Sequence, residues 1–217
     1  MKQPYDLIVF DWDGTLIDSI SWIVDCLRHA AAVCGLPDPS DSAARSVIGL
    51  SLGTAMQTLF EGISPAQQAA LVQAYQRHYV TQAIGPDDLF EGVSGMLTGL
   101  REQGYRLAVA TGKGRNGLQR ALLGTRTSTL FCATRCADET ASKPHPRMLL
   151  EIMAEIGAPA QRTLMIGDSV HDLQMAGNAQ VAAVAVTCGA NNRDELLAHN
   201  PMHCLSNTVQ LMELLRS

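Results

Sequence analysis

The sequence predicts an α/β protein: an open parallel sheet flanked by helices, with an all-helical insertion after the first strand. Two observations predict the sheet. Short apolar runs recur along the chain with helical patterns between them, which is the order of parallel βαβ units. The runs are continuously apolar rather than alternating, as expected of strands buried on both faces. A third observation predicts the insertion, because residues 19–83 contain helical patterns and no clear strand.

The strands of the core are expected at residues 6–10, 106–110, 130–134, 163–166 and 181–186. Helical patterns cover 93–103 and 146–156. Each is followed by a glycine, Gly104 or Gly157, at the place where a left-handed residue often caps a helix. These elements predict a Rossmann-like open parallel sheet.

The insertion is expected to hold three helices, at 20–33, 44–60 and 65–82. Ser64 and Pro65 give the last of these a capping residue followed by proline at the first helical position. The chain leaves the core after the first strand and returns near Gly85 and Pro86. We therefore predict a core of residues 1–18 and 84–217 and a helical cap of residues 19–83.

The composition is that of a globular protein, with 47% hydrophobic residues and a formal net charge of −5 in 217 residues. The sequence contains no basic stripe, so a nucleic-acid partner is not expected. No apolar run approaches the ~18 residues of a membrane span. The six cysteines show no zinc or disulfide spacing, which favours reduced thiols. The first apolar run stops at Asp11 without a signal-peptide cleavage pattern. These features favour a cytoplasmic location. The oligomeric state does not follow from the sequence.

Three of the predicted strands end on polar residues. The first ends at Asp11, the second at Thr111 and Gly112, and the fourth at Asp168. Ligands of open α/β sheets bind beyond the carboxyl ends of the strands, so these endings predict a site at that edge. A single strand-terminal acid is more often a helix cap, but three such endings together favour a functional site.

Asp11 and Asp13 are separated by one residue, which places both side chains on one side if the strand continues. Two carboxylates this close raise each other's pKa unless a cation neutralises them, and Mg²⁺ prefers such oxygen ligands. Asp168 supplies a third carboxylate from another strand. Asp172 follows one helical turn later; it either faces the same site or serves as a favourable acid in the first turn of a helix.

An anion site is also expected at this edge. Thr111 and the backbone amides of Gly112 and Lys113 precede a helix, and a helix N-terminus favours phosphate oxygens. Lys143 stands just before another predicted helix and would supply a cation beside the carboxylates.

Four segments resemble, in order, the successive motifs of the haloacid dehalogenase superfamily: FDWDGTLIDS, VATGKG, SKPHP and MIGDSVHDLQMAGNA. The overall pattern is most similar to the phosphoglycolate-phosphatase-like branch, including the helical cap after the first motif. The resemblance implies that the protein is a phosphatase in which Asp11 attacks phosphorus and forms an aspartyl-phosphate. Asp13 would be the general acid and then the general base.

The same resemblance implies the remaining roles. Mg²⁺ would be held by the carboxylates of Asp11 and Asp168 and the backbone carbonyl of Asp13. Thr111 and Lys143, with the amides of Gly112 and Lys113, would bind the phosphate. Asp172 would orient Lys143 or a metal-bound water, with Ser169 beside it in this outer layer.

Alternatives within the resemblance are weaker. Asp13 argues against dehalogenase chemistry, and the cap contains no lysine for a phosphonatase. A β-phosphoglucomutase-type enzyme typically carries histidine where this chain has Ile23, so a mutase is less favoured. A phosphorylation-switched receiver module would lack the helical insertion. A non-catalytic regulator on a phosphatase fold would not need the complete set of acids.

Substrate choice is expected to depend on the cap. Arg45 and the stretch 47–53, with Gly49 and Leu50, are its candidate contacts to a small phosphorylated metabolite. Phosphoglycolate is the first substrate that the resemblance suggests, with sugar phosphates, nucleotides and pyrophosphate after it.

Overall fold

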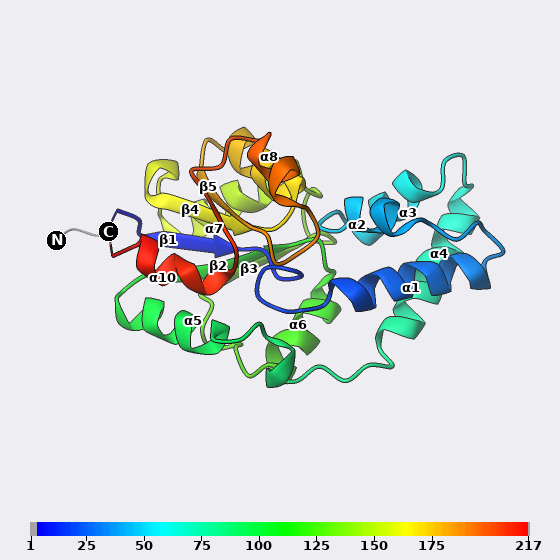
Figure 1. Cartoon of the computed structure of the whole chain (residues 1–217), viewed down its shortest axis with the longest axis horizontal. Helices are drawn as coiled ribbons and strands as arrows, with labels where there is room; N and C mark the ends of the chain where they lie inside the picture. The colour runs from blue at the N-terminus through cyan, green and yellow to red at the C-terminus, as the bar shows by residue number, and fades with distance from the viewer. Residues whose placement is uncertain (1–3, 217) are drawn as a thin grey trace.

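Residues 4–216 are described by a computed structural model, and their core is a six-stranded parallel sheet. The strands lie in the order β3-β2-β1-β4-β5-β6, with β1 in the middle (Figure 1). Their bounds are β1 Leu7–Phe10, β2 Arg106–Thr111, β3 Ala133–Cys136, β4 Thr163–Gly167, β5 Ala182–Val186 and β6 His203–Leu205. Residue 7 of β1 pairs with Arg106 on one side and Thr163 on the other, so β1, β2 and β4 end at the same edge.

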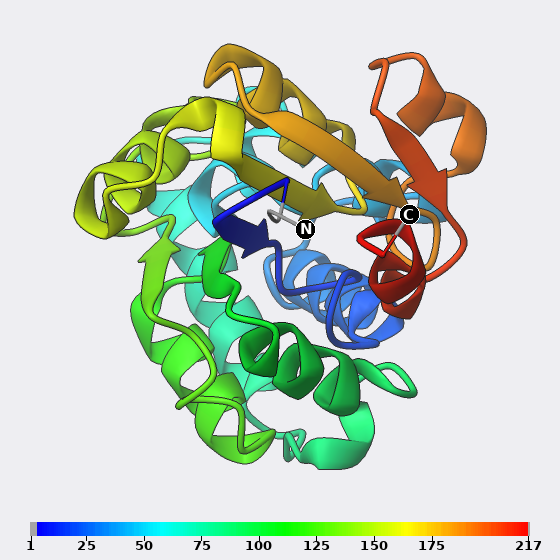
Figure 2. The same cartoon turned by 90° about the vertical axis from the view of Figure 1, so that its left-hand side faces the viewer.

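Helices cover both faces of this sheet, which explains why the strands are apolar without alternation. Ile8 and Phe10 of β1 pack towards α5 (Val93–Glu102) and α6 (Arg115–Gly124). Leu7 and Val9 face the opposite side, towards α7 (Arg147–Ile156) and α8 (Val170–Asn178). Figure 2 views the sheet from the ends where its strands begin, with the green helices on one side and the yellow-to-gold helices on the other.

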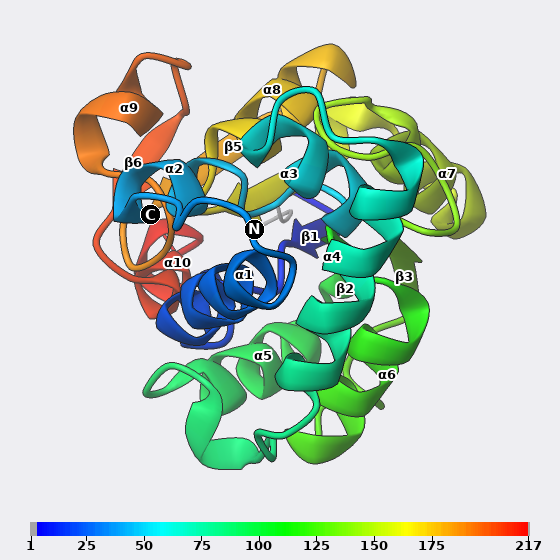
Figure 3. The same ribbon diagram turned by 90° about the vertical axis from the view of Figure 1, so that its right-hand side faces the viewer.

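The first four of the helices between β1 and β2 pack around a hydrophobic cluster of their own. They are α1 Ile20–Val33, α2 Asp41–Ser46, α3 Leu52–Leu59 and α4 Pro65–Tyr79. Leu27, Met56 and Leu71 are among the side chains buried between them, at 0 or 1% exposure. This helical cap lies beyond the carboxyl ends of the strands, as Figures 1 and 3 show from two sides. It therefore stands over the edge where the polar strand endings meet.

The remaining elements are short. They are the helices α9 Arg193–Leu197 and α10 Leu211–Leu214 and the single 3₁₀ turns η1 Pro86–Asp88, η2 Ala160–Arg162 and η3 Thr208–Gln210. Within the described residues, none of the helices has the length and apolar content that crossing a membrane requires.

Several predicted boundaries agree with the structure. Helix α1 has the expected bounds, and α4 begins at Pro65 with a full capping box between Ser64 and Gln67. Gly157 ends α7 with φ of 71°, as the cap pattern predicted.

Three predictions were wrong. The helix expected over 44–60 is two helices, because Gly49 has φ of +98° and Ser51 caps α3 by accepting a hydrogen bond from the Thr54 amide. The third strand begins at Ala133 rather than residue 130, because Leu130 lies in a turn in which its amide donates to the Thr127 carbonyl. Strand β6 was not predicted, because this three-residue edge strand has no apolar run.

Candidate active site

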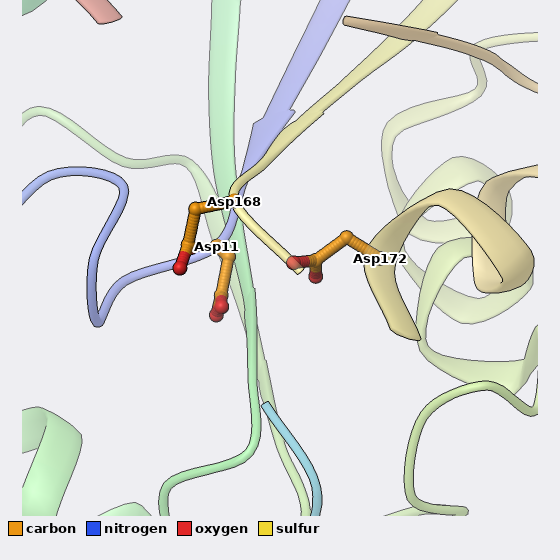
Figure 4. A group of neighbouring side chains, drawn as sticks. All are labelled: Asp11, Asp168 and Asp172. Carbon is orange, nitrogen blue, oxygen red and sulfur yellow. The ribbon is translucent and has the colours of Figure 1, made fainter. Parts of the chain in front are cut away.

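Three buried carboxylates meet at the carboxyl edge of the sheet. Asp11 follows β1, Asp168 follows β4 and Asp172 lies on the first turn of α8 (Figure 4). Their exposures are 2, 0 and 0%, and one oxygen of each lies within 4.8 Å of the others. The parallel register of β1 and β4 brings the first two together, and the turn from β4 into α8 adds the third.

Lys143 lies between two of these carboxylates. Its ammonium is 2.8 Å from Asp11 Oδ1 and 2.6 Å from Asp172 Oδ1, and its side chain is fully buried. Burial alone would lower the pKa of Lys143, but the two carboxylates raise it above its usual value. Burial raises the pKa of Asp11 well above its ordinary range, with Lys143 opposing the rise and the neighbouring carboxylates adding to it.

Asp168 is held by two hydrogen bonds. The Thr15 hydroxyl donates to Oδ1 over 2.6 Å and the Ala190 amide donates to Oδ2 over 2.7 Å. The backbone approaches so closely that a Cβ on Gly189 would lie 2.0 Å from Oδ2, and one on Gly14, whose φ is +73°, would lie 2.4 Å from it. Burial chiefly, with Asp172 adding to it, raises the pKa of Asp168 to about 7. The carboxylate is therefore fixed in place by a shell that only glycine can complete.

Asp172 and Ser169 form a capping box at the start of α8. The Asp172 amide donates to Ser169 Oγ, and Asp172 Oδ2 accepts from the Ser169 hydroxyl at 2.7 Å and from its amide at 3.2 Å. Oδ2 is thus used by the cap, and Oδ1 holds Lys143. Both sequence-based interpretations of Asp172 therefore hold: it is an acid in the first turn of a helix, and it also faces the site.

Asp13 contacts a different cation from Asp11. Its Oδ1 accepts a 2.6 Å hydrogen bond from the Ser19 hydroxyl and lies 3.0 Å from the ammonium of Lys113. Lys113 also donates to the hydroxyl of Tyr79, on α4 of the cap, over 2.7 Å. Burial opposes the charge of Lys113, but Asp13 and then Tyr79 raise its pKa above the usual value. A core lysine thus joins the second acid of the motif to the cap.

The predicted anion site lies at the end of β2. The Thr111 hydroxyl accepts from the Lys113 amide over 3.2 Å, and α6 begins two residues later at Arg115. Gly112 lies directly under the cap, because a Cβ there would be 2.4 Å from the Leu50 carbonyl oxygen and 2.6 Å from that of Gly49.

A cavity of about 460 Å³ separates the cap from the core. Of the predicted residues, those in its wall are Asp11, Asp13, Gly49, Leu50, Gly112 and Lys113. Thr111, Lys143, Asp168, Ser169 and Asp172 are buried behind this wall. Arg45 is not part of the wall; its guanidinium donates to Asp41 on the same helix over 2.7 Å. The structure therefore gives no support to Arg45 as a contact to substrate.

Four groups of the site were not predicted from sequence. Thr15 and Ser19 are short hydroxyl residues within the FDWDGTLIDS stretch, so their motif was recognised without their roles. The Ala190 amide and Tyr79 come from distant segments that carry no local signal.

The donor set fits a hard divalent cation. When all three carboxylates are ionised, the single ammonium of Lys143 leaves an excess of two negative charges among buried groups, and burial raises the pKa of Asp11 and Asp168 accordingly. Carboxylate oxygens are the ligands that Mg²⁺ prefers. This carboxylate group consists of Asp11, Asp168 and Asp172, and the carboxylate of Asp13 lies apart from it with Lys113 and Ser19. The metal role predicted for Asp13 concerns its backbone carbonyl and stays a prediction.

Comparison with known proteins finds relatives that match most of the chain. The profile described as haloacid dehalogenase-like hydrolase matches residues 8–186. A probable phosphatase named IndB from Dickeya dadantii is 38% identical over 199 residues, covering 90% of this chain and 86% of that protein. A phosphoglycolate phosphatase from Mesorhizobium japonicum is 31% identical, covering 89% and 86% of the two chains.

The names of similar proteins are not uniform. The tyrosine-protein kinase PtkA of Mycobacterium tuberculosis is 30% identical over 87% of this chain, which spans 64% of that protein. Among solved structures, a hydrolase from Pseudomonas syringae has a TM-score of 0.88 at 22% identity, covering 97% of this chain and 98% of its own. At that identity the match concerns the fold alone.

Proposed function

The chain belongs to the haloacid dehalogenase-like hydrolases, and on that premise we propose that it is a Mg²⁺-dependent phosphatase acting on a small phosphate monoester. One observation carries the proposal. Asp11, at the end of the central strand, lines a cavity under the cap and is bound on its buried side by Lys143. A second acid, Asp13, lines the same cavity with its own cation.

The first step is nucleophilic attack by Asp11. A carboxylate oxygen forms a bond to phosphorus, the bond between phosphorus and the ester oxygen breaks, and an aspartyl-phosphate remains. Lys143 holds the carboxylate from behind at 2.8 Å, which orients it and balances its charge. The Gly112 amide lies near the start of α6, where a helix N-terminus favours phosphoryl oxygens, and the neighbouring Lys113 amide donates to the Thr111 hydroxyl.

Asp13 moves the proton in both steps. It gives a proton to the departing alkoxide and later takes one from the water that attacks the aspartyl-phosphate, which restores Asp11 and releases phosphate. Ser19 and Lys113 fix the orientation of its carboxylate. Because Tyr79 of the cap holds Lys113, the cap supports the position of this acid.

The metal would be held by the carboxylates of Asp11 and Asp168, with the backbone carbonyl of Asp13. Bound there, Mg²⁺ supplies positive charge beside the transferring phosphoryl group, the main requirement of this chemistry. Asp172 completes the acidic group and orients Lys143.

A mutase has less support than a phosphatase. A mutase needs a proton-transferring group for the second sugar hydroxyl, and the position that resemblance indicates is Ile23. Ile23 is 8% exposed and forms part of the apolar wall of the cavity.

Phosphate release from a panel of esters tests the proposal. Asp11→Asn should abolish turnover and EDTA should stop the wild type, whereas Asp87→Asn, an exposed acid in the 3₁₀ turn η1, should change neither. Mass spectrometry of acid-quenched wild type should find the phosphoryl group on the peptide that contains Asp11. Turnover by Asp11→Asn at the wild-type rate would overturn the covalent mechanism.

A further inference from the structure

We infer that the leaving group of the substrate is a bulky, uncharged alcohol with an apolar or aromatic face, and not a small hydroxycarboxylate such as glycolate. This inference rests on the proposed phosphatase activity and concerns the part of the cavity that lies beyond Asp11.

The cap side of the cavity is apolar. Ile23 and Leu27 of α1, Leu52 and Ala55 of α3 and Tyr75 of α4 line it. Each of these side chains also belongs to, or packs on, the hydrophobic cluster of the cap. A carboxylate placed against such a wall would lose its hydration without a compensating partner, which is costly. An apolar group gains free energy there by leaving water.

Of the two cations in the wall, Lys113 is already paired with an acid and Arg120 is partly engaged by backbone carbonyls. Lys113 lies 3.0 Å from Asp13 and 2.7 Å from the Tyr79 hydroxyl, and its ammonium lies 4.4 Å from the centre of the Tyr79 ring. The Arg120 guanidinium donates through Nη2 to the carbonyls of Val80 and Gln82. The Nη1 of Arg120 is buried without a hydrogen-bond partner. An anionic leaving group would therefore have to draw Lys113 away from the proton-transferring acid or bind to this single nitrogen of Arg120.

The size of the cavity also favours a larger group. A volume of about 460 Å³ is within the roughly 300–1,000 Å³ of pockets that hold drug-sized ligands. Glycolate has only five non-hydrogen atoms and would leave most of this space to water against apolar walls. Tyr75 and Tyr79 are parallel, with ring centres 5.7 Å apart, and give one wall a flat aromatic character that suits a ring. Asn116 and Gln76 add neutral polar groups to the lining, which suit hydroxyl substituents rather than charges.

Two matched pairs of alkyl phosphates separate these effects, because their members differ in one property. Ethyl phosphate against 2-phenylethyl phosphate tests apolar bulk, and phosphoglycolate against the phosphate ester of glycolamide tests charge. With Mg²⁺ present, kcat/KM should be at least about ten-fold higher for the phenylethyl ester than for the ethyl ester. It should be higher for the amide than for phosphoglycolate.

Substitutions within α3 connect the preference to the wall. Leu52→Ala should reduce the phenylethyl-to-ethyl ratio about three-fold or more, since it removes apolar surface from the cavity. Leu59→Ala is the matched control, because Leu59 is equally half-buried on the same helix and lies outside the cavity lining. It should leave the ratio unchanged.

The possible failures are distinct. Phosphoglycolate as the best ester of the four, with its advantage lost in Arg120→Met, would overturn the inference and leave the phosphatase proposal standing. A lack of phosphate release from every ester would reject the proposed function itself, and the inference with it. Equal ratios in Leu52→Ala and Leu59→Ala would show that the cap wall does not select the leaving group.

Discussion

Replacing Lys143 should destabilise the metal-free protein strongly, whereas removing the nucleophile should not. Lys143 is fully buried and pairs with Asp11 at 2.8 Å and Asp172 at 2.6 Å. With all three carboxylates ionised, one ammonium leaves an excess of two negative charges, and Lys143→Met raises that excess to three. Breaking a buried pair by removing one partner costs about 3–5 kcal/mol of unfolding free energy, because the other charge stays buried.

Asp11→Asn changes the net charge of the same site in the opposite direction. It reduces the excess from two charges to one, and Lys143 keeps its bond to Asp172. Burial already raises the pKa of Asp11 well above its usual range, which means that the folded protein disfavours its charged form. We therefore expect Asp11→Asn to be neutral or stabilising while it abolishes turnover.

Urea unfolding followed by circular dichroism, in EDTA at pH 7.5, measures both effects. Lys143→Met should also lower Tm by roughly 6–20 °C, at about 2–4 °C for each kcal/mol in a chain of this size. Mg²⁺ should restore part of this loss, since a bound cation stabilises the folded state. An unfolding free energy of Lys143→Met equal to that of the wild type would refute this account of the site. An equal loss in Asp11→Asn would refute it as well.

Three further outcomes follow from packing and burial. Gly112→Ala should lower activity about ten-fold without unfolding the protein, because its Cβ would strike two carbonyl oxygens of the cap; Gly95→Ala, in open space, is the control. Iodoacetamide at pH 8 should label the exposed Cys132 first and spare Cys26, whose thiol pKa burial raises to about 12, as peptide mass mapping would show. In EDTA, the raised pKa of Asp168, about 7, lets the folded chain hold a proton that the unfolded chain has lost. Unfolding free energy should therefore fall from pH 4 to 7, and Asp168→Asn should flatten this slope in urea titrations.

The sequence predicted the core better than it predicted the cap. Strands β1, β2, β4 and β5 are buried on both faces, so their apolar runs mark them within one residue at each end. Strand β6 lies at the edge of the sheet, where His203 is exposed and no apolar run is needed. The break between α2 and α3 depends on the conformation of Gly49 and on the cap formed by Ser51, and the periodicity of apolar residues does not record either.

The candidate site likewise divides into acids that the sequence predicted and partners that it did not. Asp11 and Asp168 come together because parallel strands share an edge, and the sequence contains that information in its strand endings; the turn from β4 into α8 adds Asp172. The partners of these acids come from remote segments. Asp168 accepts from the Ala190 amide, 22 residues away, and Lys113 reaches Tyr79 of the cap, 34 residues away. Such pairings follow from tertiary packing alone.

The two acids of the first motif coexist because each has its own lysine. A shared metal ion was the expected solution to their repulsion, but the ammonium of Lys143 lies against Asp11 and that of Lys113 lies against Asp13. Both lysines belong to the core, but Lys143 is anchored there by Asp172, whereas Lys113 is held by Tyr79 of the cap. The nucleophile therefore keeps its charge partner wherever the cap stands, while the partner of the proton-transferring acid depends on the cap. Tyr79→Phe, which keeps the ring and removes the hydroxyl, should reduce kcat more than it raises KM. A change in KM alone would show that Tyr79 only binds substrate.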